Sequence, residues 1–409
     1  MNLVYLDNAA TSFPKPACVV EETLRCIRTY CGNAGRGSHP LAMRSAEKIY
    51  ECRSDLADFL GAPAAENIVF TLNSTYAINL MVKGLLHPGD HILISDMEHN
   101  AVWRPVEKCR RDGLLTYDVF PTMLREDERV GRNATRICAR IAGMLKPNTR
   151  AVLCSHQSNL CSATLPLAQI GAFCRRHHLL FLVDASQSAG HLPISMKDMC
   201  IDALCAPGHK GLYGIQGCGF CAFGEGLVPE TLIEGGSGYQ SLEPLMPSEL
   251  PERVEAGTLP TPAIAALDAG VRYLQKRGLA AVHEHECRLF DALSERLSSL
   301  RGYTVYLPEY RGSTLLFNRD GVDADTIGRA LGDRGICVRT GYHCAGLGHR
   351  TLGTPPGGAV RVSFGLFNTL RDVDALTLAL RNMEALHETA PTEGAYDNAG
   401  SIPPRESEQ

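Results

Sequence analysis

The sequence predicts an α/β protein with a large domain on a mostly parallel sheet and a smaller α+β domain toward the C-terminus. Two observations favour this fold class. Short apolar segments alternate with helical patterns through the first half of the chain, and the alternation stops near residue 225. The 409 residues, 44% of them hydrophobic and 21% charged, are enough for two hydrophobic cores.

Six segments have the features of buried strands: they are short, rich in Val, Ile, Leu, Phe or Cys, and bounded by turn residues. They are 66–71, 91–95, 151–156, 179–184, 202–206 and 217–223. The segments between them are helical in pattern. In residues 46–61, for example, the apolar side chains fall on one helix face and Gly61 provides a C-terminal stop. Ligands of such a sheet bind at the carboxyl ends of the strands.

The second half of the chain has a different pattern. Gly and Pro residues in 235–262 predict a long ordered connection, and a helical region follows at about 263–300. Strands are expected in 313–318 and 359–364, a last helix near 371–387, and a disordered tail after it. We expect an N-terminal arm at 1–15, a large domain at 16–250, a small domain at 251–388 and the tail at 389–409.

Charge and composition exclude several classes of protein. The net charge of −5 provides no basic footprint for nucleic acid or for an anionic membrane surface. No segment approaches the roughly 18 consecutive apolar residues of a membrane span, and the N-terminus has no secretory pattern. Sixteen cysteines in such a chain indicate reduced thiols, and therefore a cytoplasmic protein.

Two predicted strands end in side chains that suit a cofactor. Asp184 ends one, with Gln187 three residues later, and His209 and Lys210 follow another. A lysine with a carboxylate partner fits pyridoxal phosphate, in which the lysine forms the Schiff base and the carboxylate keeps the pyridine nitrogen protonated. The alternative is a salt bridge at the strand ends. The glycine at 211 favours the cofactor, because it allows close approach of a planar ligand.

Two more segments supply what this cofactor needs. Asn73, Ser74 and Thr75 precede an apolar helix, and a helix N-terminus with hydroxyls is an anion site that would hold a phosphate. On its own this pattern is only an N-cap. His99, just after another strand, could cover the ring, although an isolated histidine there would normally be a surface residue.

Ten motifs occur in the order that class V aminotransferase-fold enzymes have them, over residues 5–385. They are YLDNAATSFPKP, GNAGRGSH, NSTYAIN, MEHNA, SHQSNL, VDASQSAG, PGHKGLYG, EAGTLPTP, RTGYHCA and VRVSFGLFNT. On these motifs the chain resembles the cysteine desulfurase and selenocysteine lyase family. The resemblance implies fold type I of the pyridoxal phosphate enzymes, with a seven-stranded type of sheet, and a homodimer with its active site at the subunit interface.

The resemblance also implies roles for individual residues. Lys210 would carry the cofactor, Asp184 would pair with the pyridine nitrogen, Gln187 would contact the ring hydroxyl, and His99 would stack on the ring and relay protons. The phosphate would be held by Ser74, Thr75 and His209, and by Thr258 from the partner subunit. Asn159 would lie near the substrate, Arg361 would bind the substrate carboxylate, and Arg339 is a further candidate for substrate binding. Arginine suits a carboxylate because its guanidinium binds both oxygens.

Cys344 is the expected nucleophile. In the family a cysteine on a Gly-rich loop attacks the substrate sulfur, and RTGYHCA places Cys344 there. Thiolate is the reactive form, and Arg339 and His343 would favour it over the thiol. The expected reaction converts L-cysteine to L-alanine and leaves a persulfide on Cys344 for a sulfur-acceptor protein.

Alternatives remain open at this stage. Tyr342 stands where the family most often has a histidine, and residues 345–360 depart from the common pattern, so selenocysteine is an alternative substrate. Another class V reaction, a transamination or an epimerisation, would leave Cys344 without a catalytic part. Cys161, after the SN pair, could be a second thiol in the sulfur path or simple packing. Cys218 and Cys221 are expected in a strand core, and no metal site is expected.

Overall fold

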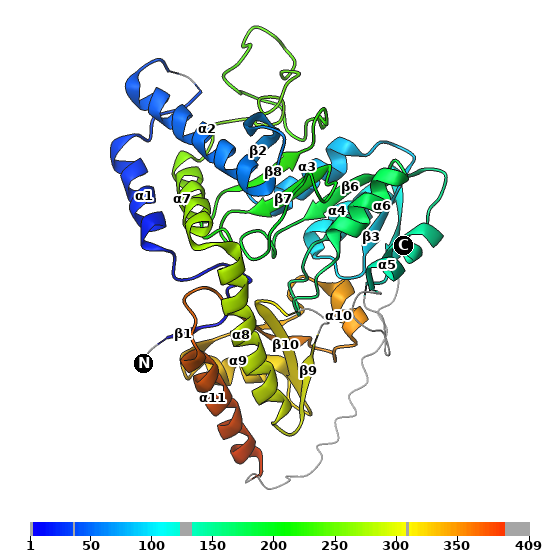
Figure 1. Ribbon diagram of the computed structural model, residues 1–409, viewed down its shortest axis with the longest axis vertical. Coiled ribbons are helices and arrows are strands. Elements are labelled where there is room, and N and C mark those ends of the chain that lie inside the picture. Colours follow the sequence, from blue (N-terminus) through cyan, green and yellow to red (C-terminus); the bar gives the residue numbers. More distant parts are fainter. Residues whose placement is uncertain (1–2, 36, 123–132, 308–310, 389–409) are drawn as a thin grey trace, which may run out of the picture.

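The computed structural model describes residues 3–35, 37–122, 133–307 and 311–388. It has a large domain that contains the long sheet and a small domain around a second sheet, with helix α8 running between them (Figure 1). The tail expected at 389–409 lies outside the described residues. In the described part of the chain, no helix is long and apolar enough to cross a membrane.

The large domain is built on a seven-stranded sheet in the order β2-β8-β7-β6-β5-β3-β4. Its strands are β2 (Ile68–Thr71), β8 (Gly219–Phe223), β7 (Ala203–Pro207), β6 (Leu180–Asp184), β5 (Thr149–Ser155), β3 (Asp90–Ser95) and β4 (Leu115–Phe120). Strand β8 is antiparallel to both neighbours, and the other pairings are parallel. The mostly parallel sheet predicted from the sequence is therefore confirmed.

Strand β4 is the one member of this sheet that the strand patterns missed. It lies at the sheet edge, and its burial alternates irregularly, with Thr116 exposed and the three residues after it half-buried. Edge strands of this kind lack the continuous apolar run of a strand that is buried on both faces.

Helices cover both faces of the sheet because successive side chains of a buried strand point to opposite sides. Val152 and Phe181 belong to one core cluster with side chains of α2 (Pro40–Leu60), α6 (Leu167–Arg176) and α7 (Thr261–Arg277). The next residues along the same strands, Leu153 and Leu182, belong to a second cluster with α3 (Ser74–Leu85) and α4 (Asn100–Arg111). Gly61 ends α2 in a left-handed conformation, with φ of 62°, as its position predicted.

The small domain has an antiparallel sheet in the order β12-β13-β10-β9. Its strands are β12 (Arg339–Gly341), β13 (Ala359–Ser363), β10 (Thr314–Arg319) and β9 (Tyr303–Tyr306). The core under this sheet includes side chains of α8 (Leu279–Ser298), α9 (Ala324–Gly332) and α11 (Leu370–Glu388). The N-terminal strand β1 (Val4–Tyr5) pairs in parallel with β11 (Ile336–Cys337), so the arm is attached to the small domain.

The boundary between the domains lies later than the expected residue 250. Helix α7 packs on α1 (Ala17–Thr29) and α2, and its Ile264, Leu267 and Val271 belong to a core cluster of the large domain. Residues of α8 instead enter the core of the small domain. Val282, near the start of α8, still belongs to the large-domain cluster, whereas Leu289 and later residues belong to the small domain. The chain therefore changes domain within α8, because the apolar face of α7 is buried against α1 and α2.

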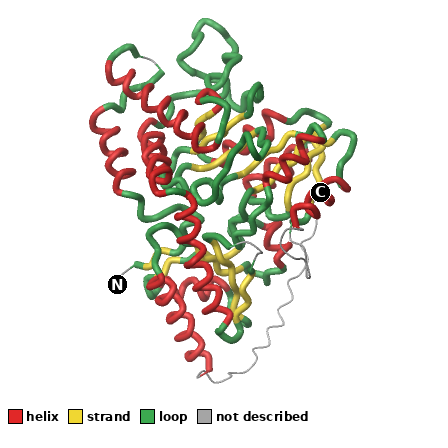
Figure 2. Tube along the Cα trace, viewed as in Figure 1, coloured by secondary structure: helices red, strands yellow, loops and turns green. Residues whose placement is uncertain are grey.

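Between β8 and α7 the chain has neither helix nor strand, and it forms the long loop at the top of Figure 2. Glu255 of this loop is fixed by Arg53 of α2. The guanidinium donates to both carboxylate oxygens, at 2.9 and 2.6 Å, and the Phe70 N–H of β2 donates to one of them at 2.6 Å. Both side chains are buried, so the pair binds the loop to a helix and a strand.

Arg53→Met is expected to destabilise the large domain by about 3–5 kcal/mol, because it leaves the Glu255 carboxylate buried without its counter-charge. The measurement is the urea unfolding midpoint of the variant beside the wild type. Lys108→Met is the control: its ion pair with Asp112 is exposed on both sides and is worth at most about 1 kcal/mol. An equal effect of the two substitutions would contradict the assignment of Glu255 as a buried charge.

Candidate active site

A cavity with an empty volume of about 340 Å³ lies at the carboxyl ends of β5 and β6 and beside the loop that follows β7. Its lining consists of Ser74, His99, Ala101, Ser155, Gln157, Asn159, Asp184, Ser186, Gln187 and Lys210. The structure therefore brings together six residues singled out from the sequence, which come from five separate segments. The topology accounts for this, because parallel strands bring their carboxyl ends to one edge.

Asp184 and Lys210 share the cavity but form no ion pair within 4 Å. The Asp184 carboxylate accepts the N–H of Ser186 at 2.9 Å, and its side chain is buried. Lys210 is half-buried in the site, and its desolvation lowers its pKa to about 8, although the charge of Asp184 acts in the opposite direction. A simple salt bridge at the strand ends, the alternative to a cofactor pocket, is therefore wrong.

His99 is uncharged at neutral pH and has a defined tautomer. Its burial, together with the positive charge of Lys210, lowers its pKa to about 3. Its Nδ1 accepts the N–H of Ala101 at 3.0 Å at the N-terminus of α4, so the remaining proton is on Nε2. A neutral ring with a single N–H donor lines the cavity.

The N-terminus of α3 reaches the cavity through Ser74. Asn73 accepts the N–H of Tyr76 at 2.9 Å, which leaves the N–H groups of Ser74 and Thr75 with no hydrogen-bond partner among the described residues. The backbone just before α3 packs closely against β8 at Gly219, where a Cβ would lie 2.7 Å from the Asn73 backbone. Free N–H groups at a helix N-terminus form an anion site.

Arg361 of β13 is 1% exposed and joins three parts of the chain. Its Nη2 lies 2.7 Å from the Asp7 carboxylate of the N-terminal arm, and its Nη1 donates to the carbonyl of Asn159 at 3.1 Å. Its buried Nε has no partner among the described residues. An unpartnered buried donor on a guanidinium fits an anionic ligand that completes its hydrogen bonds.

Cys344 lies on the exposed loop that leads from β12 to the short helix α10 (Gly346–Leu352). Its carbonyl accepts the N–H of Asn100, the neighbour of His99, at 2.6 Å, and the Asn159 side chain donates to the carbonyl of His343 at 2.9 Å. The loop is thus tied to two segments that line the cavity. Arg339 approaches the thiol, with Nη2 3.9 Å from Sγ.

His343 does not supply the cation expected of it. Burial lowers its pKa to about 2, and its ring nitrogens contact His349 and the carbonyl of Arg339 instead of Cys344. Of the two expected cations, Arg339 alone is beside the sulfur.

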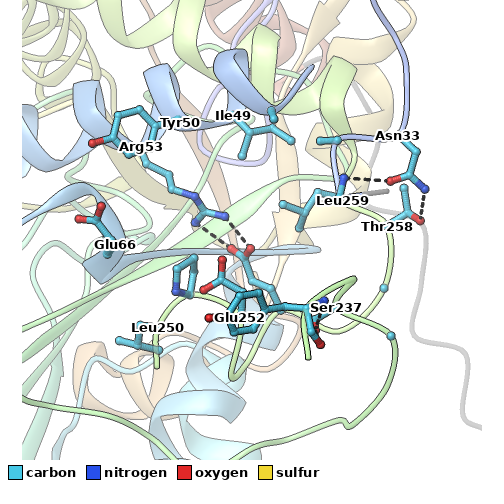
Figure 3. A pocket seen from close by; sticks show the side chains of 18 of the residues that line it. Asn33, Ile49, Tyr50, Arg53, Glu66, Ser237, Leu250, Glu252, Thr258 and Leu259 are labelled. Atoms are coloured by element: carbon cyan, nitrogen blue, oxygen red, sulfur yellow. Dashed lines mark hydrogen bonds and ion pairs between the residues drawn. The ribbon is translucent and has the colours of Figure 1, made fainter. Parts of the chain in front are cut away.

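Three residues of the expected phosphate site are not in the cavity lining. Thr75 lies on the first turn of α3, next to Ser74. The ring of His209 faces the N-terminal arm, with Nδ1 3.1 Å from the Thr11 hydroxyl. Thr258 lines a different cavity, where Asn33 donates to its hydroxyl at 3.5 Å (Figure 3). The phosphate roles of these three residues remain predictions.

Three further residues at the site were missed in the sequence analysis. Asp7 pairs with Arg361, and Lys15 donates to the carbonyl of His209 at 2.8 Å. Glu98 is fully buried and accepts from the backbone and side chain of Ser155, both at 2.8 Å, while burial raises its pKa to about 7. Asp7 and Lys15 both lie in the YLDNAATSFPKP motif, and Glu98 lies in MEHNA, so the motifs marked the segments without showing the contacts.

The structure also shows where the other cysteines considered in the sequence analysis lie. Cys161 is fully buried in a cluster with Met97, Leu316 and Ala345, and burial raises its pKa to about 11, so it is packing in this state. Cys218 and Cys221 are likewise fully buried in the large-domain core. No group of three or more metal-ligating side chains occurs in the described ranges.

Comparisons with known proteins give the chain its family. Residues 4–376 match the model of the family described as aminotransferase class-V. A probable cysteine desulfurase of Methanothermobacter thermautotrophicus is 31% identical over 392 residues, which cover 94% of this chain and 95% of the relative. A longer probable cysteine desulfurase of Mycolicibacterium paratuberculosis is 30% identical, and the chain spans 55% of its length.

A solved structure supports the same assignment. The apo structure of a cysteine desulfurase from Thermococcus onnurineus superposes with a TM-score of 0.83 and 29% identity, covering 93% of this chain and 94% of that one. A likeness over 93% of the chain extends to both domains. The chain belongs to the aminotransferase class-V family, in which its relatives are cysteine desulfurases.

Proposed function

We propose that the protein is a pyridoxal phosphate-dependent cysteine desulfurase that converts L-cysteine to L-alanine and leaves the sulfur on Cys344 as a persulfide. The observation that carries the proposal is the position of Cys344. An exposed thiol lies beside Arg339, on a loop bound through Asn159 and Asn100 to the cavity of Lys210. This arrangement suits a nucleophile that reaches into a cofactor site from the surface.

The residues of the cavity fit pyridoxal phosphate. The free N–H groups of Ser74 and Thr75 can bind its phosphate, and Asp184, unpaired with Lys210, can face its pyridine nitrogen. Ser186 lines the same cavity with a buried hydroxyl that has no partner among the described residues. When bound, the cofactor supplies an electron sink for the bond changes at the amino acid.

The protein groups then have distinct tasks. Arg361 binds the substrate carboxylate with its free Nε, and Asn159 holds Arg361 in place. Lys210 would hold the cofactor and would take the Cα proton as general base; its lowered pKa favours the neutral amine that both roles need. The Asp184 side chain lines the same cavity and would face the pyridine nitrogen of the cofactor.

Cys344 completes the reaction. Its thiolate attacks the substrate sulfur, so an S–S bond forms as the carbon–sulfur bond breaks, and the electron pair of that bond passes to the substrate carbon. Protonation of this carbon gives L-alanine, and Cys344 retains the sulfur as a persulfide. The exposure of Cys344 would let a sulfur-acceptor protein collect it. A reducing compartment such as the cytoplasm suits a mechanism that depends on a free thiol.

Replacement of Cys344 by alanine tests this assignment. With L-cysteine, we expect the variant to bind substrate but to form alanine and sulfide at least 100-fold more slowly, since it lacks the nucleophile. Alanine, sulfide and the cofactor spectrum are measured together, with Cys31→Ala as the control for another exposed thiol.

Other results would favour the alternatives. Unchanged turnover by Cys344→Ala would support a transamination or epimerisation, and the organic product would then be identified. Faster turnover of L-selenocysteine than of L-cysteine by the wild type would make selenocysteine lyase the better description.

We further propose a homodimer in which Thr258 completes the phosphate site of the partner subunit. Thr258 lies outside its own chain's Lys210 cavity, in an open cavity with Asn33 and Tyr239. Apolar side chains of α1 at helical spacing, Val20, Leu24 and Ile27, are exposed in the single chain. Such a face is typical of one that a second copy covers.

Mixed dimers test the reach of Thr258. Lys210→Ala is expected to be inactive, and Thr258→Ala to lose about tenfold in cofactor affinity, a typical effect of one hydrogen bond to a charged group. If Thr258 acts across the interface, unfolding and refolding the two variants together restores one intact site in each mixed dimer, with wild-type affinity. No gain over the separate variants would place Thr258 in its own subunit's site or outside both.

The lowered pKa of Lys210 predicts how cofactor loading depends on pH. The neutral amine attacks the aldehyde, so the loading rate of apoprotein should rise with pH up to about 8 and level off above it, instead of rising to the ordinary lysine value. Stopped-flow absorbance at several pH values measures this rate. Asp184→Asn should move the midpoint downward, because the carboxylate raises the pKa of Lys210. A midpoint near 10 would contradict the burial of Lys210 in the apoprotein.

A further inference from the structure

Three side chains behind the Cys344 loop form a continuous hydrogen-bonded chain. His343 Nδ1 lies 3.2 Å from His349 Nε2, and His349 Nδ1 lies 2.8 Å from the hydroxyl of Thr354. The other nitrogen of His343, Nε2, lies 3.3 Å from the carbonyl of Arg339. The two imidazoles are stacked, with centroids 5.4 Å apart and planes 11° apart.

The direction of each of these hydrogen bonds follows from the carbonyl of Arg339, at one end of the series. The carbonyl of Arg339 can only accept, so His343 carries its proton on Nε2 and accepts on Nδ1. His349 must then donate from Nε2, which leaves its Nδ1 to accept the Thr354 hydroxyl. A proton added to His343 would place two N–H groups against each other. These hydrogen bonds therefore require His343 to be neutral.

Burial keeps both rings uncharged. His343 and His349 are 2% and 3% exposed, and burial lowers their pKa values to about 2 and about 4. Tyr342 covers the outer side: its ring meets His349 edge-on at 5.3 Å, and its hydroxyl accepts the N–H of Gly357 at 3.1 Å. Neither imidazole lines the Lys210 cavity, and His343 reaches it only through its backbone carbonyl, which accepts from Asn159, so the effect of the pair must be exerted through the loop.

The loop has a conformation that needs such support. His343 and Cys344 both have positive φ, at 52° and 56°, a region that non-glycine residues rarely occupy because it is sterically unfavourable. The carbonyl of Arg339 accepts the last hydrogen bond of this series, from His343. The guanidinium of the same residue lies 3.9 Å from the Cys344 sulfur. The same series of hydrogen bonds therefore supports the strained backbone of His343 and Cys344 and holds the Arg339 guanidinium beside the thiol.

We propose that His343, His349 and Thr354 act as positioning residues that hold the Cys344 thiol and Arg339 in the arrangement required for attack on the substrate sulfur. This inference rests on the proposed function, in which Cys344 is the nucleophile. None of the three residues is among those that line the Lys210 cavity.

Substitutions at His349 separate hydrogen bonding from packing. His349→Gln places an amide N–H near the position of Nε2, so the bond to His343 is kept. His349→Phe keeps the ring and removes both bonds. His349→Asn keeps a polar group but is too short to reach His343. For each holoenzyme, the measurements are kcat and KM for L-cysteine and the rate of Cys344 alkylation by iodoacetamide, followed by peptide mass.

We expect the Phe and Asn variants to lose roughly 10- to 100-fold in kcat, as displaced reacting groups do, with KM and cofactor content within about threefold of wild type. Alkylation of Cys344 should slow, because Arg339 is no longer held beside the sulfur. The Gln variant should retain kcat within about threefold. His87→Phe, an exposed histidine far from the loop in sequence, is the control.

The outcomes are distinct from those of the functional test. Full activity in His349→Phe, with Cys344→Ala inactive, would overturn the inference and leave the proposed function standing. Equal losses in the Gln and Phe variants would show that ring packing matters and would also contradict the hydrogen-bonded chain. If the Phe variant does not fold, Thr354→Val, which removes the terminal hydroxyl at constant shape, should lower kcat with unchanged KM. An unchanged kcat in that variant would equally contradict the proposal.

Discussion

The site depends on one buried cation. Arg361 comes from the small domain, but its partners are Asp7 of the N-terminal arm and Asn159 of the large domain. A guanidinium that is 1% exposed must have these partners, because an unpaired buried charge is strongly unfavourable. The two domains and the arm are thus brought together around the same residue that we expect to bind the substrate carboxylate.

A second buried ion pair supports the same junction. His191, which follows β6, pairs with Glu286 of α8 at 2.9 Å, and this carboxylate raises the pKa of His191 against the effect of burial. His191 lies against Gly211, the neighbour of Lys210, where a Cβ would come within 2.6 Å of its ring. The small domain is therefore linked through His191 to the lysine loop and through Arg361 to Asn159 of the cavity.

Burial sets the protonation states that the proposed chemistry uses. It lowers the pKa of Lys210 to about 8, and it leaves His99, His209 and His343 neutral, with pKa values of about 3, 4 and 2. The permanent cations are Arg361 and Arg339, one at the substrate end and the other at the thiol. Neutral histidines can donate single hydrogen bonds or stack without adding to this positive charge.

The sequence by itself determined the fold class, the strand ends and the motif residues. Asp184 and Lys210 follow continuous apolar strands, and such strands are recognisable because both of their faces are buried. Edge strand β4, the place of α7 in the large domain and the neutral state of His343 were decided by tertiary structure. Each depends on which distant segment covers a surface, as do the contacts of Asp7 and Glu98. Local pattern reports how a residue fits its own helix or strand, whereas burial and pairing are set by segments far away in the chain.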